Sequence, residues 1–267
     1  IFMVGAYLGF FIGTFLLGGF ALRLPLALPA WLIAPLTILL AMALTSLVGV
    51  TIERVAYRPL RKRGAQRLYL VITALMFGLL LEYGNLALLG ARDRQFPELF
   101  PKEVYNFGGL SITNIKLLVI LLSVLTMIAL AFLVQRTRWG MAMRAISWDK
   151  SIVPLMGVPI NKIISFTFAI GTGLGGAAGV MYGLAYPVID PYMGIMVGWK
   201  AFICAVVGGI GNVRGAMIGG FILGAVEILV AAFFPSTYRD FVAFTLLLVL
   251  LIVRPYGILG KPQPQKV

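Results

Sequence analysis

Long stretches without charge alternate with short basic segments along this 267-residue chain. Roughly 20 mostly apolar residues, rising about 1.5 Å each, carry a helix across the hydrocarbon core of a bilayer. The charge-poor stretches therefore predict membrane-spanning helices. They are residues 1–22, 24–52, 68–91, 117–134, 163–186, 201–234 and 241–253.

Two of these stretches exceed the length of one straight helix. In 24–52, three prolines place the start of the helix near Pro29. In 201–234, the run Gly-Gly-Ile-Gly-Asn at 208–212 is expected to break the helix. Irregular backbone at membrane depth must be buried in protein or line a wet cavity, so two shortened helices meeting inside the membrane are the economical interpretation. The sequence thus predicts an all-α polytopic membrane protein of about seven to eight transmembrane segments, including one broken or re-entrant pair.

Composition narrows the class of protein further. The chain is 61% hydrophobic and 12% charged, with a mean hydropathy of +1.01, whereas soluble domains average about 45–50% apolar and about 25% charged residues. A soluble globule of this size could not bury so much apolar surface, so a soluble enzyme or binding module is excluded. The net charge of +13 indicates basic loops on one side of a membrane, and we expect no nucleic-acid partner.

Missing residue types exclude several chemistries. The chain has no histidine, and its single cysteine, Cys204, lies in an apolar stretch. His-ligated metals, haem and Ser-His-Asp catalysis are therefore excluded, as is an intrachain disulfide. We expect no catalytic, cofactor-binding or metal-binding residue here. The sequence also lacks a Gly-x4-Gly-Lys-Ser/Thr phosphate loop, so ATP hydrolysis, if it drives this protein, requires another polypeptide.

The distribution of basic residues predicts the orientation. Cations collect in 53–67, in 135–162 and in the tail after 253, whereas the charges of 92–114 are balanced. Because Lys and Arg mark cytoplasmic loops, the three basic segments are expected inside and 92–114 outside. The spans between them then alternate in direction, which places the C-terminus in the cytoplasm.

Glycines recur every fourth residue in three of the predicted helices. Such a spacing places bare backbone on one helix face, where a neighbouring helix can approach closely. We expect these glycines to serve helix packing. They are Gly5, Gly9 and Gly13, then Gly171, Gly175, Gly179 and Gly183, and finally Gly211, Gly215 and Gly219.

The cytoplasmic loop 135–162 is the longest polar-bearing inner segment. A short helix is expected to begin near Ser147, whose hydroxyl can cap it, and to end at Gly157 and Pro159. Its apolar side consists of Ile152, Leu155 and Met156. Two interpretations remain open: the helix fits a groove on a soluble partner, or it lies on the lipid headgroups.

Several separated motifs resemble the permease subunits of branched-chain amino-acid ABC transporters. The resemblance runs collinearly from about Val4 to Lys261. The motifs are ERVAYRPLR at 53–61, RWGMAMRA at 138–145, LMGV at 155–158, KAFICAVVGGIGNVRGAMIGG at 200–220 and RPYGILGK at 254–261.

The resemblance implies a multi-pass permease of the bacterial inner membrane, folded as one transmembrane domain over 1–267 with another apolar segment expected before Gly5. It implies as partners a second permease subunit, sister or identical, two cytoplasmic ATPases that hold ATP and magnesium, a periplasmic substrate-binding protein, and an amino-acid substrate. The family's coupling segment falls on Arg144 to Gly157. Its ATPase-coupling residues are expected to be Arg144, Asp149, Ile152, Leu155, Met156 and Gly157.

Charged side chains within the predicted spans are the strongest single-residue candidates for a functional role. An intramembrane carboxylate costs at least about 2.5 kcal/mol and usually faces the bundle interior. Glu82 and Glu227 lie at similar predicted depths, and Asn85 shares the helix face of Glu82. The three residues are candidates for a substrate pathway, although each carboxylate could instead be protonated or bonded to a neighbouring helix. Lys200 and Arg214 flank the broken stretch and are expected to anchor it.

Two alternative functions remain at this point. An ABC permease for urea or short amides would look similar. An ion-coupled secondary transporter or channel, from a different class, would work without a soluble ATPase.

Overall fold

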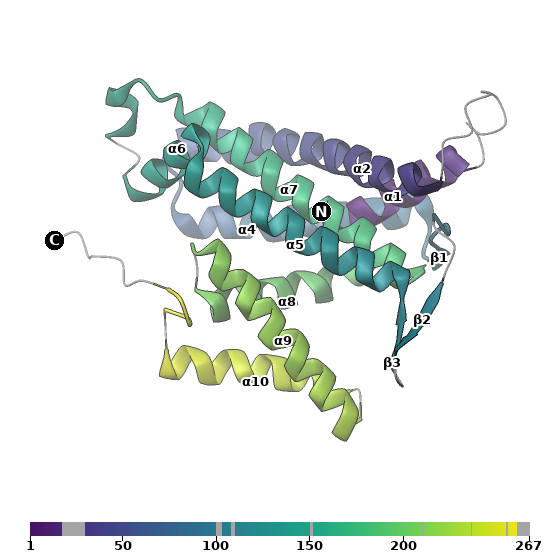
Figure 1. Cartoon of the computed structure of the whole chain (residues 1–267). Coiled ribbons are helices and arrows are strands. Elements are labelled where there is room, and N and C mark those ends of the chain that lie inside the picture. The colour runs from purple at the N-terminus through teal and green to yellow at the C-terminus, as the bar shows by residue number, and fades with distance from the viewer. Residues whose placement is uncertain are drawn as a thin grey trace. The chain divides into compact units, whose positions relative to one another are not determined.

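Long helices follow the charge-poor stretches in the computed structural model of the chain (Figure 1). Five helices of the described chain are long and apolar enough to cross a membrane, and α1 and α8 are shorter apolar helices. The predicted all-α polytopic architecture is confirmed. The structure describes residues 1–17, 30–99, 103–107, 110–149, 152–209, 211–235, 237–254 and 256–260.

The chain forms two compact units, which are described in turn. Unit 1 comprises residues 1–126 and 132–194, and unit 2 comprises 127–131 and 195–267. The helical segments of unit 1 are α1 (Phe2–Phe15), α2 (Ala30–Ile52), the π-helical segment η2 (Glu53–Tyr57), α3 (Arg58–Lys62), α4 (Arg67–Leu89), most of α5 (Asn114–Arg136), α6 (Arg138–Trp148), the 3-10 turn η3 (Val153–Met156) and α7 (Ile160–Ala185).

Short strands, which the sequence pattern did not predict, connect the helices of unit 1. Strand β1 (Arg94–Gln95) pairs antiparallel with β4 (Val188–Ile189), and β2 (Val104–Phe107) pairs antiparallel with β3 (Leu110–Thr113). The first ribbon joins the segments that follow α4 and α7, whereas the second lies wholly between α4 and α5. The balanced loop 92–114 is therefore partly ordered as β structure.

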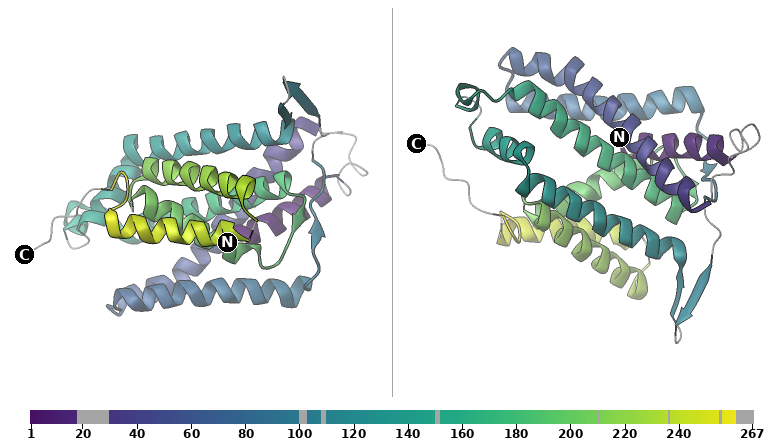
Figure 2. Two further views of the ribbon diagram at one scale, coloured as in Figure 1. Left: turned by 90° about the horizontal axis from the view of Figure 1, so that it is seen from below. Right: turned by 45° about the horizontal axis from the view of Figure 1, so that its top comes forward.

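The core of unit 1 lies where α1, α2 and α7 pack together. The two longest of them, α2 and α7, run side by side over most of their length (Figure 2). Their contact is made by small residues: a side-chain carbon on Gly49 would overlap Thr172, and one on Gly173 would overlap Ser46. Close backbone approach of this kind replaces the hydrophobic driving force that lipid removes.

The packed glycines of α7 differ from the predicted ladder. Gly179 lies against the backbone of α1, and Gly183 lies against the ring of Phe96. Gly175 makes only an ordinary contact, 3.5 Å from Ile1 Cγ2 to the position of an added Cβ, and Gly171 has nothing within 4 Å. The expectation that Gly171 packs against a helix of this chain is therefore corrected.

The glycines of α1 all face packed neighbours. An added carbon on Gly5 would overlap the backbone of Gly176, one on Gly9 would lie 2.6 Å from Val180 Cγ2, and one on Gly13 would lie 3.0 Å from Pro97 Cγ. Helix α1 is thus held against α7 at one end and against the segment after β1 at the other.

Unit 2 contains most of α8 (Met193–Gly208), together with α9 (Val213–Phe233) and α10 (Tyr238–Val253). The predicted break at 208–212 is confirmed, because α8 ends at Gly208 and Asn212 caps α9. The expectation of two shortened helices is corrected: α9 has 21 residues and is long enough to span a membrane. Helix α8 also begins eight residues before Ala201, since Lys200 is accommodated within it.

Two of the laddered glycines of unit 2 pack, and one does not. Gly215 and Gly219 of α9 lie against the backbone of Gly208 and Cys204 of α8. Gly211 lies between the helices with φ +92° and has nothing within 4 Å of an added Cβ. It therefore serves a turn that requires positive φ, and the packing role expected for Gly211 is corrected.

Candidate functional site

The inner segment between α5 and α7 begins with a capped helix. The backbone N–H of Gly140 donates to Thr137 Oγ1 (3.1 Å), which starts α6 at Arg138, and extended backbone at Asp149 ends it. The prediction of a helix start near Ser147 is wrong. Ser147 lies in the last turn of α6, where its hydroxyl donates to the carbonyl of Arg144 (2.7 Å). Thr137 is the hydroxyl residue that caps α6.

The 3-10 turn η3 gives the same segment an inner and an outer side. Val153 is buried against Ile146 of α6 and Ile163 of α7, whereas the side chains of Leu155 and Met156 are 86% and 78% exposed. Gly157, at φ +76°, ends the turn as predicted. Ile152 is exposed as well, so Ile152, Leu155 and Met156 form one apolar patch, called the exposed tip below.

The other predicted coupling residues surround this tip. The side chain of Arg144 is exposed, and the backbone N–H of Asp149 donates to the carbonyl of Ala145 (3.0 Å). The arrangement differs from the predicted single helix: a helix and a separate turn share one apolar base on α7, and the exposed tip points away from that base.

Glu82 is the one buried residue of the part of α4 whose side chains are described, with 7% of it exposed. It faces inward from a helix that is otherwise open. One turn further along, the Nδ2 of Asn85 lies 3.6 Å from the Sδ of Met3 on α1. Glu82 and Asn85 thus share one face of α4, and Asn85 brings this face against α1, as expected for an intramembrane carboxylate.

Glu227 lies in unit 2 and is ion-paired. The Nζ of Lys200 on α8 is 3.1 Å from the Oε1 of Glu227 on α9 and 3.0 Å from the Oδ1 of Asp240 on α10. The three side chains are between 22% and 42% exposed. Lys200 therefore joins all three helices of the unit rather than flanking a break, and Asp240 is a partner that sequence reasoning missed.

Removing the ammonium group should loosen unit 2. Lys200→Met leaves two carboxylates without their ammonium partner, and we expect it to lower the free energy of unfolding by about 2 kcal/mol. Breaking a fully buried ion pair costs more, but these side chains are partly exposed to solvent. Thermal unfolding of the purified chain in detergent measures this. Lys162→Met, at an exposed position of α7, is the matched control. Equal melting temperatures of the two variants would contradict a stabilising role for the ion pairs of Lys200.

The chain after α10 closes the break between α8 and α9. The N–H groups of Ile258 and Leu259 donate to the carbonyls of Val207 (2.9 Å) and Gly208 (3.1 Å), which end α8. The side-chain amide of Asn212 donates to the carbonyl of Leu259 (3.1 Å). Residues 207, 208 and 212 are therefore hydrogen-bonded to residues 258 and 259, which lie about 50 positions later in the sequence.

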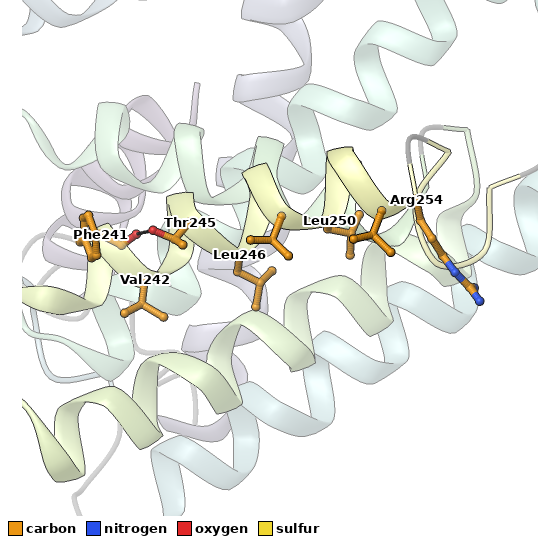
Figure 3. A pocket seen from close by; sticks show the side chains of 8 residues that line it. Phe241, Val242, Thr245, Leu246, Leu250 and Arg254 are labelled. Carbon is orange, nitrogen blue, oxygen red and sulfur yellow. Dashed lines mark hydrogen bonds between the residues drawn. The ribbon is translucent and has the colours of Figure 1, made fainter.

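The remaining features of the described residues are few. They contain no group of three or more His, Cys, Asp or Glu side chains that could hold a metal ion. A groove of about 510 Å³ runs along one face of α10 from Phe241 to Arg254, and its lining is almost wholly apolar (Figure 3). Its one hydroxyl, on Thr245, donates to the carbonyl of Phe241 (2.8 Å).

Comparison with known proteins gives consistent results. The model of the family described as "Branched-chain amino acid transport system / permease component" matches residues 1–251. The chain is 38% identical over 272 residues to the high-affinity branched-chain amino acid transport system permease protein LivH of Salmonella typhimurium, covering 100% of this chain and 85% of LivH.

Further relatives agree. The chain is 38% identical over its whole length to BraD of Pseudomonas aeruginosa, of which it covers 86%. It is 26% identical over 234 residues to a probable branched-chain amino acid transport permease protein LivH of Methanocaldococcus jannaschii, covering 80% of this chain and 71% of that protein. No solved structure matches the chain. With the collinear match over residues 1–251 and the polytopic helical fold, this chain belongs to the permease family of branched-chain amino acid transport systems.

Proposed function

We propose that this chain is a permease subunit of an ATP-driven importer that moves branched-chain or related amino acids across the bacterial inner membrane. The observation that carries the proposal is the 38% identity with LivH and BraD over the full length of the chain. The amino-acid class is taken from the names of these relatives. Translocation rather than catalysis is the role of the chain, and ATP is hydrolysed on separate subunits.

The exposed tip is consistent with binding to a soluble ATPase subunit. Leu155 and Met156 present apolar side chains on a segment that the basic loops assign to the cytoplasm. A short apolar projection of this kind fits a groove on a soluble protein. Two cytoplasmic ATPases bind beneath a pair of permease chains in this proposal, and a periplasmic binding protein delivers the substrate from the other side.

Reconstitution tests the proposal directly. The chain is purified in mild detergent with whatever ATPases, second permease and binding protein accompany it, and the complex is placed in liposomes. We expect uptake of labelled leucine that requires both the binding protein and ATP. Uptake by the chain alone down an ion gradient would instead identify a secondary transporter and overturn the proposal.

Glu82 belongs to the solute route in this proposal, together with Asn85. Glu82→Gln is expected to keep the fold and to raise the KM for the amino acid about tenfold, because a hydrogen bond to a charged group contributes about 1.5–3 kcal/mol and about 1.4 kcal/mol is a factor of ten. Initial uptake rates measure the effect. Glu103→Gln, at an exposed position outside the helices, is the matched control, and unchanged kinetics of the Glu82 variant would remove this residue from the route.

A further inference from the structure

Glu53 is a fully buried carboxylate in a segment that is otherwise basic. Its side chain has no exposed surface, although the motif ERVAYRPLR, which begins with it, contains three arginines. It is the first residue of η2, the π-helical turn through which α2 continues into α3. Single π-helical turns within helices occur frequently at functional sites. A buried carboxylate at such a turn calls for a role.

Both oxygens of Glu53 are engaged, each by a different element. Oε1 accepts from the Nη2 of Arg61 in α3 at 2.6 Å, and Oε2 accepts from the Oγ of Ser165 in α7 at 2.6 Å. The bond to Ser165 spans 112 positions of the sequence. Glu53 therefore ties the inner end of α2 to the first turns of α7.

Ser165 lies two residues beyond the point where the coupling segment rests on α7. Ile163 of α7 forms an apolar cluster with Ile146 of α6 and Val153 of η3. The base of α7 is thus held by the segment that bears the exposed tip and, through Ser165, by the carboxylate of Glu53. These contacts form a continuous chain from the tip to α2.

Further along the membrane, α2 and α7 are joined without charge. The Oγ of Ser46 donates to the carbonyl of Ala169 (2.8 Å), and Gly49 and Gly173 allow the two backbones to approach closely. These contacts leave little freedom for the pair to separate. A displacement of the base of α7 would therefore reach α2 as well, provided that the inner ends stay connected.

We propose that Glu53 is a positioning residue that locks α2 to the base of α7, so that movement of the coupling segment displaces both helices together. The inference rests on the proposed ATP-driven function. Stability alone does not account for the charge, because well-packed apolar side chains of similar volume are often as stabilising as a buried ion pair. A carboxylate that accepts hydrogen bonds from both Arg61 and Ser165 fixes the relative position of α3 and α7, because each bond has a defined geometry.

Three variants and one control test the lock in the reconstituted complex. Glu53→Gln and Ser165→Ala weaken it, Ser165→Thr keeps the hydroxyl, and Thr167→Ala removes an exposed hydroxyl from the same helix. The measured quantity is the amount of amino acid imported per ATP hydrolysed. We expect this ratio to fall about tenfold in Glu53→Gln, within the range that coupling between sites commonly spans. In Ser165→Ala we expect a fall of about threefold, because only one hydrogen bond is lost. Ser165→Thr and Thr167→Ala should match the wild type.

The ratio distinguishes positioning from mere stability. A purely structural role would lower ATP hydrolysis and import together in proportion to the folded complex, which would overturn the inference. If Glu53→Gln fails to fold, Ser165→Ala decides, because it removes one hydrogen bond and leaves the ion pair. An unchanged ratio in Ser165→Ala would also overturn the inference. Failure of the proposed function is separate, since the wild-type complex would then show no ATP-dependent import.

Discussion

Replacing Gly176 by leucine is expected to prevent stable folding of unit 1. Gly176 lies where three helices meet: an added carbon would lie 2.6 Å from the Cγ2 of Thr45 on α2, and the backbone of Gly176 already faces Gly5 on α1. A leucine side chain has no space on either side. Because forcing extra carbons into a packed core costs typically about 1–3 kcal/mol even when it can adjust, we expect a loss of more than about 3 kcal/mol here.

A second glycine of the same helix provides the control. Gly171 is exposed and has nothing within 4 Å of an added Cβ, so Gly171→Leu gains the same helix propensity without a clash. Size-exclusion chromatography in detergent and thermal unfolding measure both variants. We expect Gly171→Leu to elute and melt like the wild type, and Gly176→Leu to aggregate. Similar melting temperatures would mean that the α1–α2–α7 contact is not formed as described.

The contrast between Gly171 and Gly176 also explains why the ladder misled sequence reasoning. A step of four residues advances about 400° around a helix, so each glycine is turned about 40° from the one before. From Gly171 to Gly183 the drift is about 120°, and these glycines cannot all face one neighbour. Gly171 has no neighbour among the described residues, Gly179 faces α1 and Gly183 faces Phe96, and such partners become visible only when the helices are placed in space.

Helix ends that are set by neighbouring charges, prolines or glycines could be predicted from the sequence. The end of α8 at Gly208 follows from the glycines after it, whereas the helix start predicted near Pro29 lies outside the described residues. These features depend on neighbouring residues alone. The family could also be assigned, because its motifs are contiguous in the chain.

Pairings between distant residues could not be predicted. Lys200 forms an ion pair with Asp240, and Glu53 and Asn212 form hydrogen bonds with Ser165 and Leu259. In each case the partner belongs to a different element. Nothing in the local pattern distinguishes a lysine that neutralises two carboxylates from one that reaches for lipid headgroups. The cap of α6 was also missed: Thr137 and Ser147 are both suitable cap residues by type, and the structure shows that Thr137 caps the helix.

Replacing the apolar side chains of the exposed tip by charged ones is expected to abolish binding of the ATPase subunit. In Leu155→Asp/Met156→Asp, two side chains that are 86% and 78% exposed change character, so the fold of unit 1 should remain intact. If each side chain is buried in a partner's groove, it contributes about 1.5–3 kcal/mol to the contact. Losing both therefore weakens binding of the ATPase at least about a hundredfold.

Pull-down of the ATPase and ATP-dependent import measure this loss, and the matched control is the swap Leu155→Met/Met156→Leu, which preserves apolar area and volume. We expect the control to assemble and transport like the wild type and the aspartate pair to insert normally but bind no ATPase. The other interpretation of this segment, that it lies on lipid headgroups, predicts the opposite. In that case the aspartates would weaken contact with the membrane, and the ATPase would still bind, so one pull-down separates a docking tip from an interfacial connector.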